Sequence, residues 1–174
     1  AVKAISDFAI SLGINIPTGK DSLSMTQKYP DGKSVQSPGT VIISAIGEVN
    51  NINSVISPNL KYKLDTELIY IGTSKNLSLA GSAFSQTQGN IGGELPELYN
   101  SDYIKTLFNS IQKLINEKKI LSGHDISSGG FITSILEMNF SNKNYGMELD
   151  LKDFKENDLI KILFNESPGI ILQV

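Results

Sequence analysis

One short stretch, residues 123–130, gathers most of the side chains in this sequence that could do chemistry. It reads Gly-His-Asp-Ile-Ser-Ser-Gly-Gly and holds the only histidine of the 174 residues, His124, beside the carboxylate of Asp125. An apolar lead-in and a following helix-like run predict a strand, a polar loop and a helix N-terminus. Backbone N–H groups in a first helical turn lack partners within the helix and lie at the positive end of its dipole. Such a site suits phosphate: Ser127 or Ser128 could cap the helix, glycines would let an anion approach the backbone, and Asp125 could hold magnesium.

The same residues also fit a structural interpretation. Ser-Ser-Gly-Gly before an apolar run is an ordinary cap and turn, and a single histidine is usually not a metal ligand. The pattern alone favours this structural interpretation slightly. The loop is not a Walker-type P-loop, because no Gly-Lys-Ser/Thr sequence closes it.

A second polar loop lies at residues 17–22, with the sequence Pro-Thr-Gly-Lys-Asp-Ser, where a strand is expected to begin. Lys20 could meet a phosphate as a point charge, and Asp21 could bind a metal ion or a hydroxyl group. The alternative is an exposed Lys–Asp pair, which contributes little to stability. The residues by themselves favour that alternative.

Four stretches together resemble the phosphoribosylformylglycinamidine synthase (FGAM synthase) family, the glutamine-dependent enzymes of purine synthesis. They are His-Asp-Ile-Ser-Ser-Gly-Gly at 124–130, Pro-Thr-Gly-Lys-Asp-Ser-Leu-Ser-Met at 17–25, Ser-Pro-Gly-Thr-Val-Ile-Ile-Ser-Ala at 37–45 and Leu-Phe-Asn-Glu at 163–166. Their order and spacing agree with the family over nearly the whole chain. Ser128 stands where the family usually has Asp; either residue can cap a helix, so only a charge contribution is in question.

The resemblance implies a bound nucleotide, ATP or ADP, with Mg²⁺. It implies that Asp125 is a metal ligand and that Ser127 contacts the nucleotide. It also implies nucleotide contacts for Gly19 and Lys20 and a substrate contact for Ser22. No catalytic residue is assigned.

The family joins an ATP-activated formamide oxygen of its substrate, FGAR, to ammonia from glutamine. Long members have two pseudo-equivalent halves, and the resemblance places this chain in the second half. Asp125 and Ser127 then either serve turnover or hold an auxiliary nucleotide that stabilises the fold, and we favour the auxiliary role. The expected partners are FGAR, the nucleotide and the rest of a parent chain with a glutaminase domain. A kinase-like relative of the same superfamily is a weaker alternative.

Composition restricts the other possibilities. The net charge is −3 and no basic stripe is evident, which argues against a nucleic-acid binder. The chain has no cysteine, so it carries neither disulfides nor a cysteine nucleophile, and this fits a cytoplasmic location. No apolar run approaches about 20 residues and no signal peptide is visible, so we expect no membrane span. The sequence begins and stops inside predicted elements, from which we expect a piece of a longer polypeptide.

Alternating strand and helix patterns predict an α/β fold with a layered sheet. The family resemblance implies an AIR synthase-like C-terminal-type domain over residues 64–174. The tail of an N-terminal-type domain would precede it over 1–49, with a linker over 50–63. The expected helices are 2–12 (ended by Gly13), 102–118 (capped by Ser101, with Phe108 in its buried apolar stripe), 130–140 and 158–163. The expected strands are 22–26, 40–49, 67–72, 120–122, 147–151 and 169–174.

Overall fold

The computed structural model describes residues 1–22, 24–144 and 146–174. The chain forms two compact units, Ala1–Asn50 (unit 1) and Asn51–Val174 (unit 2). Among the helices of the described residues, none combines the length and apolar character needed to cross a membrane.

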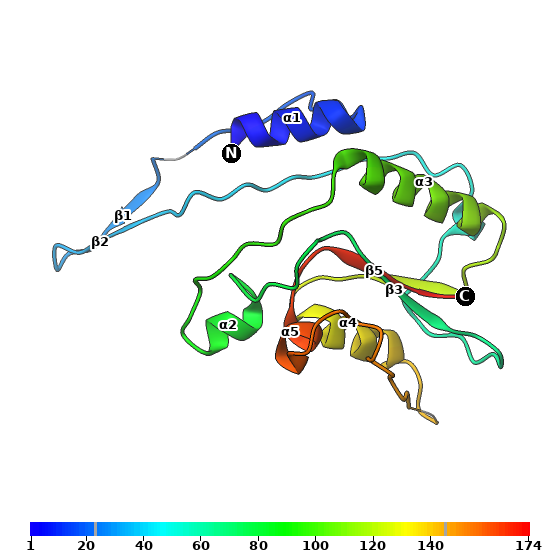
Figure 1. The fold of residues 1–174 in the computed structure, drawn as a ribbon. Coiled ribbons are helices and arrows are strands. Elements are labelled where there is room, and N and C mark those ends of the chain that lie inside the picture. Colours follow the sequence, from blue (N-terminus) through cyan, green and yellow to red (C-terminus); the bar gives the residue numbers. More distant parts are fainter. Residues whose placement is uncertain (23, 145) are drawn as a thin grey trace. The chain divides into compact units, whose positions relative to one another are not determined.

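The described residues of unit 1 form one helix and one hairpin (Figure 1). Helix α1 (Val2–Leu12) ends at Gly13, as predicted, and this glycine has a left-handed φ of 75°. Strands β1 (Thr26–Lys28) and β2 (Ser34–Gln36) pair antiparallel. A turn at residues 29–33 closes this hairpin, and the Tyr29 N–H donates to the Lys33 carbonyl at 2.9 Å. None of the described residues of unit 1 is buried.

Two strand predictions in unit 1 are wrong. Residues 40–49 form no strand, and their apolar side chains are exposed, Ile42 by 87% and Ile46 by 102%. A strand needs a neighbour to pair its backbone groups, and no ladder to this segment forms among the described residues. The strand expected at 22–26 begins only at Thr26. Leu23, which belongs to that prediction, lies outside the described residues.

Among the described residues, the sheet of unit 2 has three strands, β3 (Leu68–Gly72), β4 (Ser122–Asp125) and β5 (Gly169–Gln173). Their order is β3-β5-β4, and β5 pairs antiparallel with both neighbours. The register places Tyr70 and His124 opposite Ile171. The last strand of the chain is therefore the centre of the sheet.

Helices cover both faces of this sheet (Figure 1). Helix α3 (Ser101–Asn116) packs on one face, and helices α4 (Gly130–Asn139) and α5 (Leu159–Phe164) lie on the other. The α3-side core consists of Ile111, Ile120 and Leu172. The α4-side core consists of Ile126, Phe131, Ile135, Met138 and Ile171. Successive residues of β5 thus enter opposite layers, as expected for a strand covered on both faces.

Three details of unit 2 differ from the predictions. Asn100 rather than Ser101 caps α3, because the Asn100 side chain accepts the Tyr103 N–H at 2.8 Å. Phe108, expected in the buried stripe of α3, is 59% exposed. Residues 147–151 form no strand.

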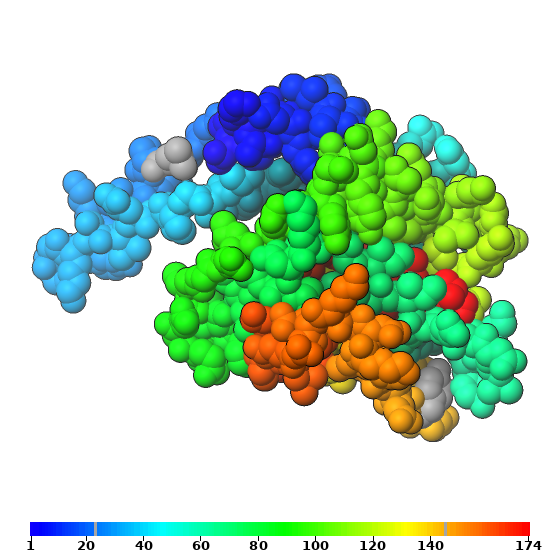
Figure 2. Space-filling model, viewed as in Figure 1, coloured from blue at the N-terminus to red at the C-terminus, as the bar shows by residue number. Residues whose placement is uncertain are grey.

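The side chains of residues 147–151 nevertheless alternate between the core and the solvent. Met147, Leu149 and Leu151 pack against the α4-side core. In the space-filling view the segment after α4, coloured orange, lies over this side of the unit (Figure 2). An alternation of buried and exposed side chains does not require a partner strand. The apolar pattern therefore identified the side chains that face the core, but it wrongly implied that this backbone pairs with another strand.

Candidate functional site

The loop at residues 123–130 begins inside a strand. The strand predicted at 120–122 lies later in the chain, as β4 (Ser122–Asp125). His124 and Asp125 are therefore its last two residues. Ile126 is buried, and its N–H donates to the Gly169 carbonyl at 2.8 Å. The two serines that follow are exposed. Their hydroxyl groups are therefore accessible from solvent at the end of the strand.

Neither serine caps α4, which corrects the prediction. The N-cap residue is Gly129, with φ 89° and no side-chain cap hydrogen bond. The Ser127 carbonyl instead accepts the Gly130 N–H at 3.0 Å and closes a tight turn. Positive φ at both Gly129 and Gly130 favours glycine, which has no Cβ.

Gly130 also lies against the end of α5. A Cβ built there would come within 2.6 Å of the Asn165 carbonyl oxygen and 2.7 Å of the Phe164 carbonyl carbon. The missing Cβ of Gly130 therefore makes room for the backbone of Phe164 and Asn165, and not for a ligand. It fixes the contact between α4 and α5 beneath the loop.

His124 ties β4 to α4. Its Nε2 lies 3.0 Å from a carboxylate oxygen of Glu137, and its Nδ1 lies 2.7 Å from the Asp125 carbonyl oxygen. The side chain is 16% exposed. Both ring nitrogens face oxygen acceptors of the protein, so the arrangement supports the structural interpretation of this histidine.

Asp125 presents its side chain to solvent, with 79% exposure. Its backbone carbonyl accepts the Ser134 hydroxyl at 3.2 Å, so the strand end is anchored to α4 while the carboxylate remains accessible. Within the described part of the chain, no three His, Cys, Asp or Glu side chains gather around a possible metal position. Magnesium is often held by one or two carboxylates together with water and phosphate oxygens, so one exposed carboxylate fits a shared magnesium site.

The residues predicted in the second loop lie in unit 1. Gly19, Lys20 and Ser22 are all exposed, and a Cβ added to Gly19 would meet nothing within 4 Å. Their accessibility is compatible with ligand contacts. Asp125 and Ser127 belong to unit 2, so the predicted contacts come from different units.

The structure adds Glu166, which the sequence analysis did not single out. One of its carboxylate oxygens accepts the backbone N–H groups of Gly129 and Ala83, each at 2.8 Å. Ala83 opens helix α2 (Ala83–Thr87). The Leu-Phe-Asn-Glu motif at 163–166 was the available signal, but its donors are 37 and 83 residues away along the chain.

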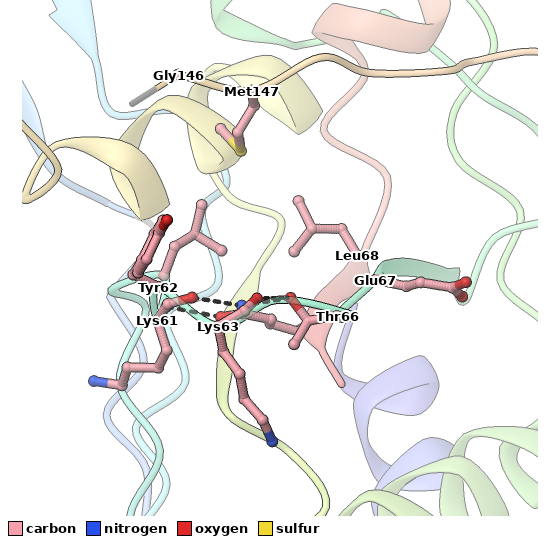
Figure 3. Close-up of a pocket in the computed structure, with 10 residues that line it drawn as sticks. Lys61, Tyr62, Lys63, Thr66, Glu67, Leu68, Gly146 and Met147 are labelled. Carbon is pink, nitrogen blue, oxygen red and sulfur yellow. Dashed lines mark hydrogen bonds between the residues drawn. The ribbon is translucent and has the colours of Figure 1, made fainter. Parts of the chain in front are cut away.

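Two surface hollows lie elsewhere. One, of about 210 Å³, is lined by Lys61, Lys63, Met147 and neighbouring residues (Figure 3). Its polar atoms are used internally: the Gln173 side chain exchanges two 2.8 Å hydrogen bonds with the Lys61 backbone and donates to Thr66 at 3.1 Å. The second, of about 340 Å³, lies between residues 53–61 and 115–121. Neither hollow is lined by residues 123–130, and we base no site on them.

Comparison with known proteins connects this geometry to a family. The family model described as AIR synthase related protein, C-terminal domain, matches residues 65–174. The chain belongs to the AIR synthase-related family. Residues 1–48 match a second model, described as FGAR-AT PurM_N-like domain. Helices packed on antiparallel strands, preceded by the PurM_N-like segment, confirm the α/β fold expected from the resemblance.

Curated relatives match this AIR synthase-related chain over nearly its full length. A probable phosphoribosylformylglycinamidine synthase, chloroplastic/mitochondrial, of Arabidopsis thaliana is 39% identical over 100% of the chain. A probable phosphoribosylformylglycinamidine synthase of Caenorhabditis elegans is 36% identical over 100% of the chain, and the phosphoribosylformylglycinamidine synthase of Dictyostelium discoideum is 37% identical over 97%. The chain spans only 12–14% of the length of these relatives. The resemblance inferred from the four motifs is confirmed.

Proposed function

We propose that the chain is a segment of an FGAM synthase. This enzyme converts FGAR, glutamine and ATP into FGAM, glutamate, ADP and phosphate in purine biosynthesis. The supporting observation is the 36–39% identity to proteins of that name across 97–100% of the chain. The sequence holds no cysteine, so a glutaminase nucleophile of the cysteine type must come from another part of the protein. A cytoplasmic location belongs to the same proposal.

Within this enzyme, we assign Asp125 and Ser127 to an auxiliary site that holds ATP or ADP without turnover. The exposed carboxylate of Asp125 would bind Mg²⁺, and the exposed hydroxyl of Ser127, two residues further on, would contact the nucleotide. Bound magnesium would neutralise phosphate charge there. Gly19, Lys20 and Ser22 belong, in this proposal, to the catalytic cleft as nucleotide and substrate contacts.

Kinetics and melting separate these two roles in the full-length protein. Lys20→Ala and Ser22→Ala should lower turnover about 10- to 100-fold at unchanged melting temperature, because each removes a ligand contact from an exposed loop. Asp125→Ala should release the nucleotide and lower the melting temperature, since a ligand that binds only the folded state stabilises it. A ligand present at about 100 times its Kd contributes about 2.7 kcal/mol.

Exposed residues of the same type are the controls. Lys28→Ala in β1 and Asp153→Ala remove equivalent charges and should change neither turnover nor melting temperature. Loss of turnover in Asp125→Ala at unchanged stability would move the 123–130 loop to the catalytic cleft. Wild-type kinetics in Lys20→Ala and Ser22→Ala would remove the loop at residues 17–22 from that cleft.

A further inference from the structure

The Glu166 carboxylate joins two segments that are remote in sequence. One of its two oxygens accepts the N–H groups of Gly129, the N-cap residue of α4, and of Ala83, the first residue of α2, both at 2.8 Å. Hydrogen bonds from backbone N–H groups to a carboxylate are stronger than those between neutral groups. The negative charge also lies at the positive end of the α4 dipole.

The position of Glu166 is fixed from the opposite side. Its neighbour Asn165 is 1% exposed, and the Asn165 amide donates to the carbonyls of Lys161 and Ile162 at 2.8 and 3.0 Å. The same side chain accepts the Ser167 N–H at 3.2 Å. Glu166 therefore extends from a buried, fully hydrogen-bonded corner after α5, which gives its carboxylate a rigid base.

The hydrogen bond to Gly129 controls the loop that carries Ser127. The turn from Ser127 to Gly130 is closed by a single 3.0 Å backbone bond, and neither serine caps the helix. In place of a serine cap, Glu166 accepts the N–H of the N-cap residue. Displacement of Gly129 would shift Ser127, two residues earlier, and loosen the end of β4 at Asp125.

We propose that Glu166 is a positioning residue that holds the Asp125–Ser128 segment in its ligand-binding conformation. This inference rests on the proposed function, in which Asp125 and Ser127 bind a magnesium nucleotide. The carboxylate occupies the Gly129 N–H and brings a negative charge to the α4 N-terminus. A bare phosphate is therefore disfavoured at this position, and a magnesium-bound phosphate is the ligand class that the site would accept.

Calorimetric titration of the nucleotide-stripped full-length protein with MgADP, and with ADP in EDTA, tests this role. Glu166→Ala should weaken MgADP binding about tenfold or more, because two charge-assisted hydrogen bonds are lost. Glu166→Gln keeps an acceptor oxygen and should recover most of the affinity. ADP without magnesium should bind weakly to the wild type. Glu148→Gln, which neutralises an exposed carboxylate of the same unit, is the matched control and should bind as the wild type does.

Hydrogen exchange on the same proteins distinguishes positioning from general stability. In Glu166→Ala, amides near Gly129 and Ala83 should exchange faster, while amides of α3 stay at wild-type rates. Faster exchange throughout unit 2, with equal losses in Glu166→Ala and Glu166→Gln, would reduce Glu166 to a structural residue and overturn the proposal.

The titration also separates this inference from the function on which it rests. If Asp125→Ala weakens MgADP binding and Glu166→Ala does not, the positioning role is wrong and the proposed nucleotide site stands. If neither variant changes the affinity, the nucleotide site itself is wrong, and the positioning role fails with it.

Discussion

Two glycines with similar backbone angles play different parts in unit 2. Gly130 has φ 78° and lies against the Asn165 backbone, whereas Gly81 has φ 73° and open space around its Cβ position. Both positions penalise an L-residue by their conformation. Only Gly130 adds a steric conflict with backbone atoms that cannot move away without displacing α5.

Gly130→Ala should therefore destabilise the chain by about 2–5 kcal/mol, through left-handed strain together with overpacking. Gly81→Ala carries the strain alone and should cost about 1–2 kcal/mol. Urea unfolding of the two variants measures the difference. Equal losses of stability would show that the contact with Asn165 relaxes freely.

Sequence reasoning proposed single residues of the candidate site but not the hydrogen bonds that support them. Asp125 was proposed because a carboxylate stands beside glycines and hydroxyls in one local stretch, and the nucleotide contact of Ser127 was implied by the family resemblance. Glu166 was missed because its donors are distant in sequence, and only the fold brings Gly129 and Ala83 to one carboxylate. Local chemistry is visible in a sequence, whereas hydrogen bonds between distant segments are not.

At the scale of elements, helices depend on local signals and could be predicted, whereas strands depend on distant partners. Helices α1, α3, α4 and α5 lie close to their predicted positions, because helical periodicity and caps are local. The strands expected at 40–49 and 147–151 are absent, because strand formation depends on a partner that the apolar pattern does not reveal. The pairing of β5 between β3 and β4 was likewise not predictable from any single segment.

The α4-side layer should respond to high pH through Tyr70. Burial raises the pKa of Tyr70, whose ring packs against Phe131 and Phe154 with centroids 5.5 and 5.2 Å away. The unfolded chain then loses the tyrosine proton first, so this contribution to stability is complete below pH 10 and declines as pH rises through the folded pKa.

Melting temperatures measured from about pH 9 to about pH 11 check this. Tyr70→Phe removes the titrating hydroxyl, so its melting temperature should fall less steeply above pH 10 than that of the wild type. Tyr99→Phe removes an exposed hydroxyl and should keep the wild-type slope. A Tyr70→Phe profile parallel to the wild type would exclude Tyr70 as a source of the alkaline loss.

At the scale of the whole molecule, the two units differ in how much they bury. The described residues of unit 1 include none that is buried, and its regular structure is an 11-residue helix and a two-stranded hairpin. Isolated helices of this length and isolated hairpins are marginal in water. Unit 2 has a sheet covered on both faces, with Ile171 and Leu172 at 1% and 3% exposure.

Hydrogen exchange of the 174-residue chain should therefore show two levels of protection. Amides of α1 should exchange at nearly unstructured rates, while those of β5 and α4 should open only with unit 2 as a whole. Ile171→Ala removes a buried side chain from the central strand and should cost about 2–5 kcal/mol. It should accelerate exchange in β5 and α4 and leave α1 unchanged, because the core that it damages lies within unit 2. Exchange in α1 as slow as in β5, or accelerated by Ile171→Ala, would show instead that unit 1 is stabilised cooperatively with the sheet.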